Sequence, residues 1–187
     1  MMRQFHSVKA QHPGMLLFFR MGDFYEMFEQ DAVEASRILN LTLTSRNGIP
    51  MCGVPHHAAA NYLERLLKAG QKVAVCDQIE DPRQAKGLVK RAVTRVLTPG
   101  TIVEDLSLTA KAHNYLASLF WDADKGAGGL AWADISTGEW SGLYSRRETE
   151  LWQWAVKISP RELLLPAGRK VPQEQGDLAA QVTPVLQ

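Results

Sequence analysis

Residues 21–26 read Met21-Gly22-Asp23-Phe24-Tyr25-Glu26, and this stretch decides the fold of the first half of the chain. An apolar run, Met15–Phe19, precedes it. Gly22-Asp23 is a turn signal, so we predict that the apolar run pairs with Phe24–Phe28 as a β-hairpin. Side chains alternate across a strand, which puts Phe24 and Glu26 on one face and Tyr25 and Met27 on the other.

This alternation allows two interpretations of Phe24 and Glu26. If Tyr25 and Met27 point into the core, an aromatic ring and a carboxylate stand side by side at the surface, as in a binding site. In the alternative, Phe24 is a core residue and Glu26 is a solvated charge. Spacing alone leaves both interpretations open.

Composition gives a weak indication of the partner. The chain has 187 residues, of which 45% are hydrophobic and 22% charged, which is ordinary for a globular protein of one or two domains. The formal net charge of +1 gives no global argument for nucleic acid. Residues 82–101, however, hold five basic side chains and no acidic one, a stripe suited to phosphate contact or to a solvated face: Arg83, Lys86, Lys90, Arg91 and Arg95.

The sequence gives little indication of a metal site or of a membrane-spanning segment. Cys52 and Cys76 lack a Cys-x-x-Cys spacing, so reduced intracellular thiols are expected. His56-His57 beside Cys52 is a poor ligand set, because adjacent histidines do not share a helix face, and no metal site is predicted. No apolar stretch approaches the roughly 20 residues that span a bilayer, and the N-terminus does not have the pattern of a signal peptide.

The rest of the first half alternates helices and strands. Helices are predicted at 2–11, 31–39 (with Asp31 as N-cap) and 58–69, with a helical turn opened by Asp81-Pro82. Strands are predicted at 41–44, 72–77 and 89–97, and a loop at 45–50 that contains the turn dipeptide Asn47-Gly48. This alternation predicts an α/β domain, and the first hairpin makes its sheet mixed.

The second half has a different character, since all five tryptophans lie beyond residue 120. We place the boundary in the stretch 98–111. Strands are predicted at 115–121, 130–135, 139–144 and 161–165, and a helix that ends near Ile158, with Ser145 and Glu148 as its capping box. Beyond Pro166 no clear element is expected.

The first half resembles the bacterial MutS mismatch-repair family. The resemblance rests on a set of blocks in the family's order over about the first hundred positions, which is far more specific than a single Phe-x-Glu. Besides 21–26, these are Lys9-Ala-Gln-His-Pro13, Leu41-Thr-Leu-Thr44, Met51-Cys-Gly-Val-Pro-His-His-Ala58, Asn61-Tyr-Leu63, Val73-Ala-Val-Cys-Asp-Gln78, Asp81-Pro82 and Thr98-Pro-Gly-Thr101. The strand order of the second half resembles the start of the family's connector domain, which has a ribonuclease H-like fold.

The resemblance implies a domain plan and a fold class. The expected parts are a mismatch-recognition domain at 1–106, a linker at 107–113 and a truncated connector domain at 114–187, so the chain is expected to be an N-terminal fragment. The fold class is α/β, with a mixed-sheet N-terminal domain flanked by helices and followed by an incomplete ribonuclease H-like α/β connector domain.

The resemblance also implies roles for residues and partners. Phe24 wedges beside a mispaired base from the minor groove and Glu26 hydrogen-bonds that base, while Met21, Arg46 and Arg91 match family positions near the DNA. The implied partners are mismatched double-stranded DNA, a second copy of the full-length protein in a homodimer, and a MutL-type repair protein on the connector domain. The implied location is the cytoplasm.

Catalysis is not expected from this chain. It has no Gly-x-x-x-x-Gly-Lys-Ser/Thr motif, so ATP and Mg²⁺ are expected only for the ATPase module of full-length family members. A ribonuclease H-like nuclease is an alternative, since such enzymes hold metals with carboxylates on core strands. The carboxylates of the second half scatter like rim charges instead: Asp122, Asp124, Asp134 and Glu139. The second alternative is a protein-interaction scaffold in which Phe24 only packs.

Overall fold

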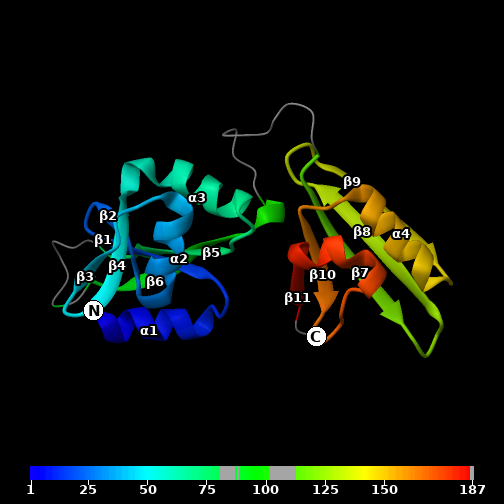
Figure 1. The fold of residues 1–187 in the computed structure, drawn as a ribbon, viewed down its shortest axis with the longest axis horizontal. Helices are drawn as coiled ribbons and strands as arrows, with labels where there is room; N and C mark the ends of the chain where they lie inside the picture. The colour runs from blue at the N-terminus through cyan, green and yellow to red at the C-terminus, as the bar shows by residue number, and fades with distance from the viewer. Residues whose placement is uncertain (81–86, 88, 102–112, 186–187) are drawn as a thin grey trace. The chain divides into compact units, whose positions relative to one another are not determined.

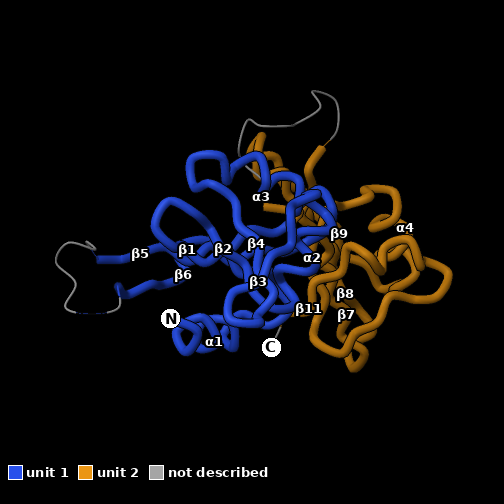
Figure 2. The backbone as a smooth tube through the Cα atoms, turned by 60° about the vertical axis from the view of Figure 1, so that its left-hand side comes forward, with its two compact units in different colours: residues 1–98 blue, residues 99–187 orange. Residues whose placement is uncertain are grey.

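The computed structural model describes residues 1–80, 87, 89–101 and 113–185. They form two compact units, unit 1 at 1–98 and unit 2 at 99–187 (Figure 2). Each unit is a mixed β-sheet with flanking helices, which confirms the predicted α/β class. The predicted helical turn at Asp81-Pro82 and nearly all of the predicted linker lie outside the described residues.

The sheet of unit 1 has six strands in the order β3-β4-β2-β1-β5-β6 (Figure 1). The predicted hairpin is its centre: β1 and β2 pair antiparallel, and β5 pairs parallel to β1 on the other side. The strand predicted at 72–77 is therefore an interior strand, and the strand predicted at 89–97 forms the edge. The strands are β1 (Leu16–Met21), β2 (Phe24–Phe28), β3 (Thr44–Arg46), β4 (Ile49–Pro55), β5 (Val73–Gln78) and β6 (Arg91–Leu97).

Helices cover the two faces of this sheet unequally (Figure 1). Helices α2 (Glu29–Leu39) and α3 (Ala59–Lys68) pack on the face that carries Tyr25 and Met27. Helix α1 (Met2–Gln11) packs on the other face, chiefly through Phe5. One short helix covers less area than two, so part of the second face stays open.

Three local predictions in unit 1 were wrong. The strand predicted at 41–44 begins only at Thr44, since β3 is Thr44–Arg46. The segment predicted as a loop is a tight β3–β4 hairpin, because Asn47 and Gly48 both take positive φ angles, 52° and 77°, as a two-residue turn requires. Asp31 is not an N-cap. It lies inside the first turn of α2 and is buried, where it accepts hydrogen bonds from Lys9 Nζ at 2.7 and 2.8 Å and from the Leu17 N–H at 2.9 Å.

The sheet of unit 2 has the order β11-β10-β7-β8-β9. Strands β7, β8 and β9 form an antiparallel meander, and β10 and β11 add parallel to β7. The predicted β-β-β-α-β order is confirmed. The elements are β7 (Tyr115–Asp122), β8 (Ala127–Asp134), β9 (Glu139–Ser145), α4 (Glu148–Ile158) and β10 (Glu162–Pro166), with 3-10 turns at Pro99–Thr101 and Gln173–Gln181.

Unit 2 also holds elements that the sequence pattern missed. The segment beyond Pro166 forms the 3-10 stretch and an edge strand, β11 (Val182–Val185). The capping box differs too: Ser145 Oγ accepts the Arg147 N–H at 2.9 Å and donates to Glu150, not to Glu148. None of the helices in the described part of the chain is long and apolar enough to cross a membrane.

Candidate functional site

Phe24 stands at the turn end of the central hairpin. The turn Gly22-Asp23 joins β1 and β2, with Gly22 at a φ of 59° that favours glycine, and Met21 and Phe24 are the last paired residues. Phe24 is 47% exposed, whereas Phe28 on the same strand and the same face is 1% exposed. The difference comes from α1, whose Phe5 ring packs edge-on against Phe28 and does not cover Phe24.

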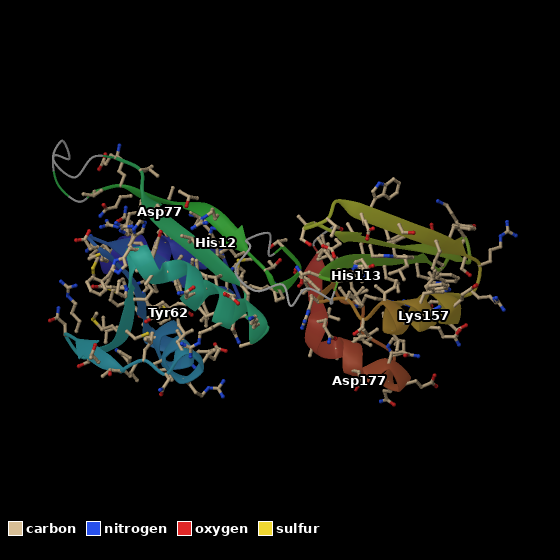
Figure 3. All side chains as sticks on the ribbon, turned by 90° about the horizontal axis from the view of Figure 1, so that it is seen from above. His12, Tyr62, Asp77, His113, Lys157 and Asp177 are labelled. Carbon is tan, nitrogen blue, oxygen red and sulfur yellow. The ribbon has the colours of Figure 1, made fainter. Side chains whose placement is uncertain are left out.

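Tyr25 holds the hairpin from the opposite face. Its hydroxyl donates to Asp77 Oδ1 on β5 at 2.6 Å, and Thr94 Oγ1 donates to the other carboxylate oxygen. Asp77 lies near the end of β5 (Figure 3). Burial, with Asp77 as hydrogen-bond acceptor and neighbouring charge, raises the pKa of Tyr25 to about 12, so the phenol keeps its proton. This bond crosses β1 and fixes the strand on which Phe24 is displayed.

Glu26 lies beside Phe24 on the same face of the sheet, and its side chain is mostly buried. Phe19 is its cross-strand neighbour on β1 and Gly53 on β4. Its Oε2 atom is buried and accepts no hydrogen bond from the described residues, although Arg46 Nη1 lies 3.7 Å away. Desolvation raises the pKa of Glu26 above its usual value, and the charge of Arg46 opposes that rise.

Gly53 leaves room for this carboxylate. A β-carbon at position 53 would lie 3.3 Å from the Tyr25 carbonyl oxygen and 3.6 Å from Glu26 Cγ. The glycine therefore permits a close approach of β4 to β2 at Glu26, and a larger side chain would press on the acid.

Arg46 and Met21 flank the pair formed by Phe24 and Glu26. Arg46 ends β3 at the exposed β3–β4 turn, and its side chain reaches Glu26. Met21 is half-buried at the rim of the cluster beneath α1. The structure thus brings four of the five predicted contact residues to one region of the sheet.

Arg91 is partly buried and is held by hydrogen bonds within the protein. Its Nε donates to the Arg20 carbonyl at 2.6 Å and its Nη1 donates to Gln4 Oε1 at 3.1 Å, while the guanidinium carbon lies 5.1 Å from the Phe19 ring centroid. Arg91 therefore joins β6 to α1 and to the end of β1. Of the predicted basic stripe, Arg83 and Lys86 lie outside the described residues, and Lys90 and Arg95 are exposed.

The carboxylates of unit 2 are engaged in its turns. Asp134 is buried and accepts the Asn114 N–H at 3.1 Å, the Ser136 N–H at 3.0 Å and the Ser136 hydroxyl at 2.6 Å. Glu139 lies opposite Asp134 in the β8–β9 register, a proximity that the sequence analysis missed. Asp122 accepts the N–H groups of Asp124 and Lys125, both at 3.1 Å.

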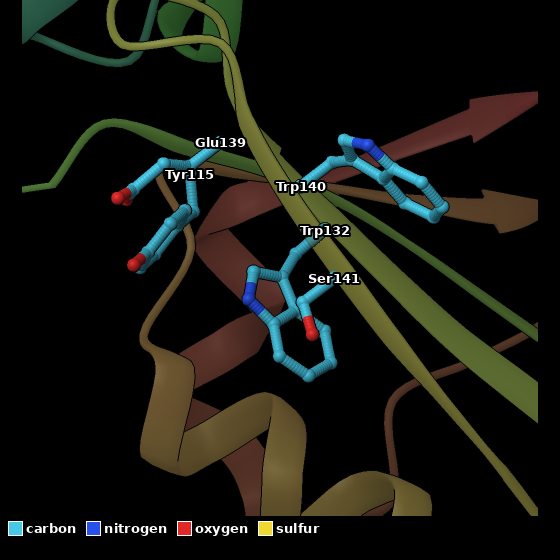
Figure 4. A pocket seen from close by; sticks show the side chains of 5 residues that line it. All are labelled: Tyr115, Trp132, Glu139, Trp140 and Ser141. Atoms are coloured by element: carbon cyan, nitrogen blue, oxygen red, sulfur yellow. The ribbon is translucent and has the colours of Figure 1, made fainter.

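A small pocket lies beside the β8–β9 turn. It has a volume of about 280 Å³ and is lined by Tyr115, Trp132, Glu139, Trp140 and Ser141 (Figure 4). Within the described ranges, no three His, Cys, Asp or Glu side chains are grouped as metal ligands would be. Cys52 and Cys76 are free and buried, and burial raises the pKa of each thiol to about 11.

The fold and site together define an α/β module that displays an aromatic ring and an underpartnered carboxylate on an open sheet face. The family model described as MutS domain I matches residues 1–106, and the chain belongs to this family.

Curated proteins of similar sequence carry the name of the same family. The chain is 59% identical over 177 residues to the DNA mismatch repair protein MutS of Nitratidesulfovibrio vulgaris, covering 92% of this chain and 20% of that protein. It is 48% identical over 186 residues to the DNA mismatch repair protein MutS of Myxococcus xanthus, covering 97% of this chain and 21% of that protein. The chain thus spans about a fifth of the length of these relatives.

Proposed function

We propose that this chain recognises mismatched or unpaired bases in duplex DNA and thereby serves DNA mismatch repair, as the names of its relatives describe for them. The observation that carries the proposal is the exposure of Phe24 beside a carboxylate with an oxygen that has no hydrogen-bond partner among the described residues. A large exposed aromatic residue on a strand whose other apolar residues are buried suits insertion into a ligand.

DNA mechanics supplies the mechanism. A mispair stacks and pairs poorly, so it is easier to kink than a normal pair. An apolar wedge in the minor groove costs a few kcal/mol of unstacking and bends the duplex by roughly 20–90°. Phe24 is such a wedge in our proposal, and a mismatched site offsets that cost better than a matched one. Deformability then gives most of the selectivity, so that one phenylalanine serves many mismatches.

Glu26 has a second role in this proposal. A carboxylate next to a polyanion is repelled, so it favours binding only where the DNA offers a partner. An unstacked base presents such a partner, because an ionised carboxylate accepts a hydrogen bond and a protonated one donates one. At a matched pair only repulsion is left. We therefore expect both Glu26→Ala and Glu26→Gln to tighten binding to matched duplex.

Three cations and one thioether complete the proposed interface. Met21, Arg46 and Arg91 are proposed to lie near the groove or the phosphates, with exposed Lys90 as a further backbone contact. Because Arg91 also donates to Arg20 and Gln4, its loss would disturb the protein as well as the DNA contact. Lys90→Gln is therefore the cleaner test, and we expect it to flatten the log–log salt dependence by about one unit.

The rest of the proposal concerns the longer relatives. ATP and Mg²⁺ are expected to act only in the ATPase module of a full-length protein, so we propose that this chain binds without catalysing. Homodimerisation, a MutL-type partner and a cytoplasmic location are proposed on the same grounds.

The deciding experiment compares dissociation constants for a duplex with one mismatch and for its matched counterpart. Phe24→Ala should abolish the preference for the mismatch. Phe120→Ala is the control, because Phe120 in unit 2 is similarly exposed, at 49%. If the unmodified chain shows no preference, or if Phe24→Ala keeps it, the proposal is wrong. A scaffold that only binds proteins would show the first of these results.

A further inference from the structure

The environment of Glu26 is incomplete at one atom. Its side chain is 16% exposed, and Oε2 is buried without a hydrogen bond from any described residue. A buried polar atom without a partner costs free energy comparable to a lost hydrogen bond, so it requires an explanation. The nearest described cation is Arg46, whose Nη1 lies 3.7 Å from that same oxygen.

The other charged groups on this side of the sheet are engaged elsewhere. On α1, His6 pairs with Glu29 at 2.9 Å and Lys9 with Asp31 at 2.7 Å. Arg91 of β6 donates to the Arg20 carbonyl. Among the neighbours across the sheet, Phe19 and Gly53 carry no charge.

Two further cations near this region point away or are exposed. Arg20 belongs to β1 but lies 5.6 Å from the Tyr25 ring centroid, on the opposite face, and donates to the Gly22 carbonyl. Arg3 on α1 is exposed. Arg46 is thus the cation that acts on Glu26 in this part of the structure, and it does so from an exposed hairpin turn.

The contact between Arg46 and Glu26 is a loose one. The N–O distance of 3.7 Å is longer than a charge-assisted hydrogen bond, and the Arg46 side chain is 51% exposed. Since the guanidinium is half exposed and makes no hydrogen bond to the carboxylate, it can leave without breaking a hydrogen bond of the fold. The same oxygen can therefore take a different partner.

We propose that Arg46 is a specificity-determining residue that pairs loosely with Oε2 of Glu26 in the free protein and is displaced from it by a hydrogen-bond donor of an unpaired base. This inference rests on the proposed function. At matched DNA no donor arrives, and Arg46 stays to offset the repulsion between Glu26 and the duplex. At a mismatch the base and Arg46 compete for one atom. Arg46 therefore lowers the discrimination that Glu26 would otherwise provide.

The competition predicts an unusual result for Arg46→Gln. A plain phosphate contact would weaken matched and mismatched binding equally. Removing a competitor at Glu26 instead raises the mismatch-to-matched affinity ratio, by about two- to fivefold for a weak exposed pair. In a Glu26→Gln background the same change should leave the ratio alone, because the charge on which Arg46 acts is gone. Arg46→Lys keeps a cation and should stay close to the unmodified protein.

The first arm of the experiment uses the DNA-free chain and follows the carboxyl ¹³C shift of Glu26 against pH. Arg46→Gln should move the titration midpoint of Glu26 upward, and Arg46→Lys should restore part of the shift. Arg37→Gln is the control for charge removal, because Arg37 is exposed on α2, which covers the opposite face. An unchanged midpoint in Arg46→Gln contradicts the pairing, whatever the DNA results are.

The second arm measures dissociation constants at about pH 8, where carboxylates are ionised, for matched and singly mismatched duplexes. A ratio that rises with Arg46→Gln in the unmodified background only is the expected result. Equal losses on both duplexes, or the same change in the Glu26→Gln background, overturn the inference. If the unmodified chain shows no mismatch preference, the proposed function fails, and the specificity role of Arg46 with it, while the titration still judges the ion pair.

Discussion

Glu26 in unit 1 and Asp134 in unit 2 are two acids on β-sheets with opposite surroundings. Both are desolvated, and desolvation raises the pKa of a carboxyl group. At Asp134 the hydrogen bonds from Ser136, Asn114 and His113 outweigh that effect, and the pKa falls below its usual value. At Glu26 the charge of Arg46, which is too far away for a hydrogen bond, opposes the effect of desolvation only in part, and the pKa rises.

The contrast separates an acid with satisfied oxygens from an acid with an unsatisfied one. Asp134 has a donor for each of its oxygens, so it closes the β8–β9 turn and has little left to offer a ligand. Glu26 has an oxygen that the described protein does not satisfy. An acid kept in that state costs stability, and a ligand that supplies the missing donor recovers the cost.

Phe28 and Phe24 provide the largest expected difference, since both flank Glu26 on β2 but only Phe28 is covered by α1. We expect Phe28→Ala to cost about 3–5 kcal/mol, as for a buried phenylalanine, and Phe24→Ala to cost about 1 kcal/mol. Amide hydrogen exchange in β1 and β2 measures both, because unit 1 contains no tryptophan. Phe28→Ala should also hydrate Glu26 and lower its pKa. Equal losses for the two variants would mean that Phe24 is part of the core.

Asp134→Asn tests the satisfied acid. The amide nitrogen would face N–H donors, so we expect a loss of roughly 2–3 kcal/mol in unit 2, which tryptophan fluorescence reports because all five tryptophans lie there. Since the folded pKa of Asp134 is lowered, its contribution is full above the unfolded pKa near 3.8 and is lost as pH falls through the folded value. The difference in the free energy of unfolding between the variant and the unmodified chain should therefore disappear at acidic pH. A gap that persists unchanged would contradict this account.

Glu26→Gln should show a smaller effect of opposite sign. The folded pKa of Glu26 is raised, so stability is full below the unfolded pKa near 4.5 and falls as pH rises through the folded value. At neutral pH the variant should therefore be more stable than the unmodified chain, by less than about 1 kcal/mol for a partly exposed group. Hydrogen exchange in β2 at two pH values checks this, and a stability loss at neutral pH would show that Glu26 is satisfied after all.

The sequence determined most of the elements and which residues of a strand share a face. Alternation in 24–28 put Tyr25 and Met27 on the face opposite Phe24 and Glu26, because the two-residue period of a strand is local geometry, but it left open which face is buried. The turn residues marked both hairpins of unit 1, although the second was expected to be a looser loop. The local sequence pattern did not predict β11, because its Pro184 argues against a strand. The strand forms at the edge of the sheet, where it pairs with β10.

Tertiary packing alone decided the chemistry of the site. Phe24, Glu26 and Phe28 share a face by sequence, yet one is open, one is half-covered and one is buried, because α1 extends over only part of that face. Asp31 looked like a helix cap, but Lys9 and the Leu17 N–H meet it in the interior. The Arg46–Glu26 contact depends on the β3–β4 hairpin, which pairs with β2 and forms the edge of the sheet. Sequence period sets which side a residue faces, whereas burial and pairing depend on which distant segment arrives above it.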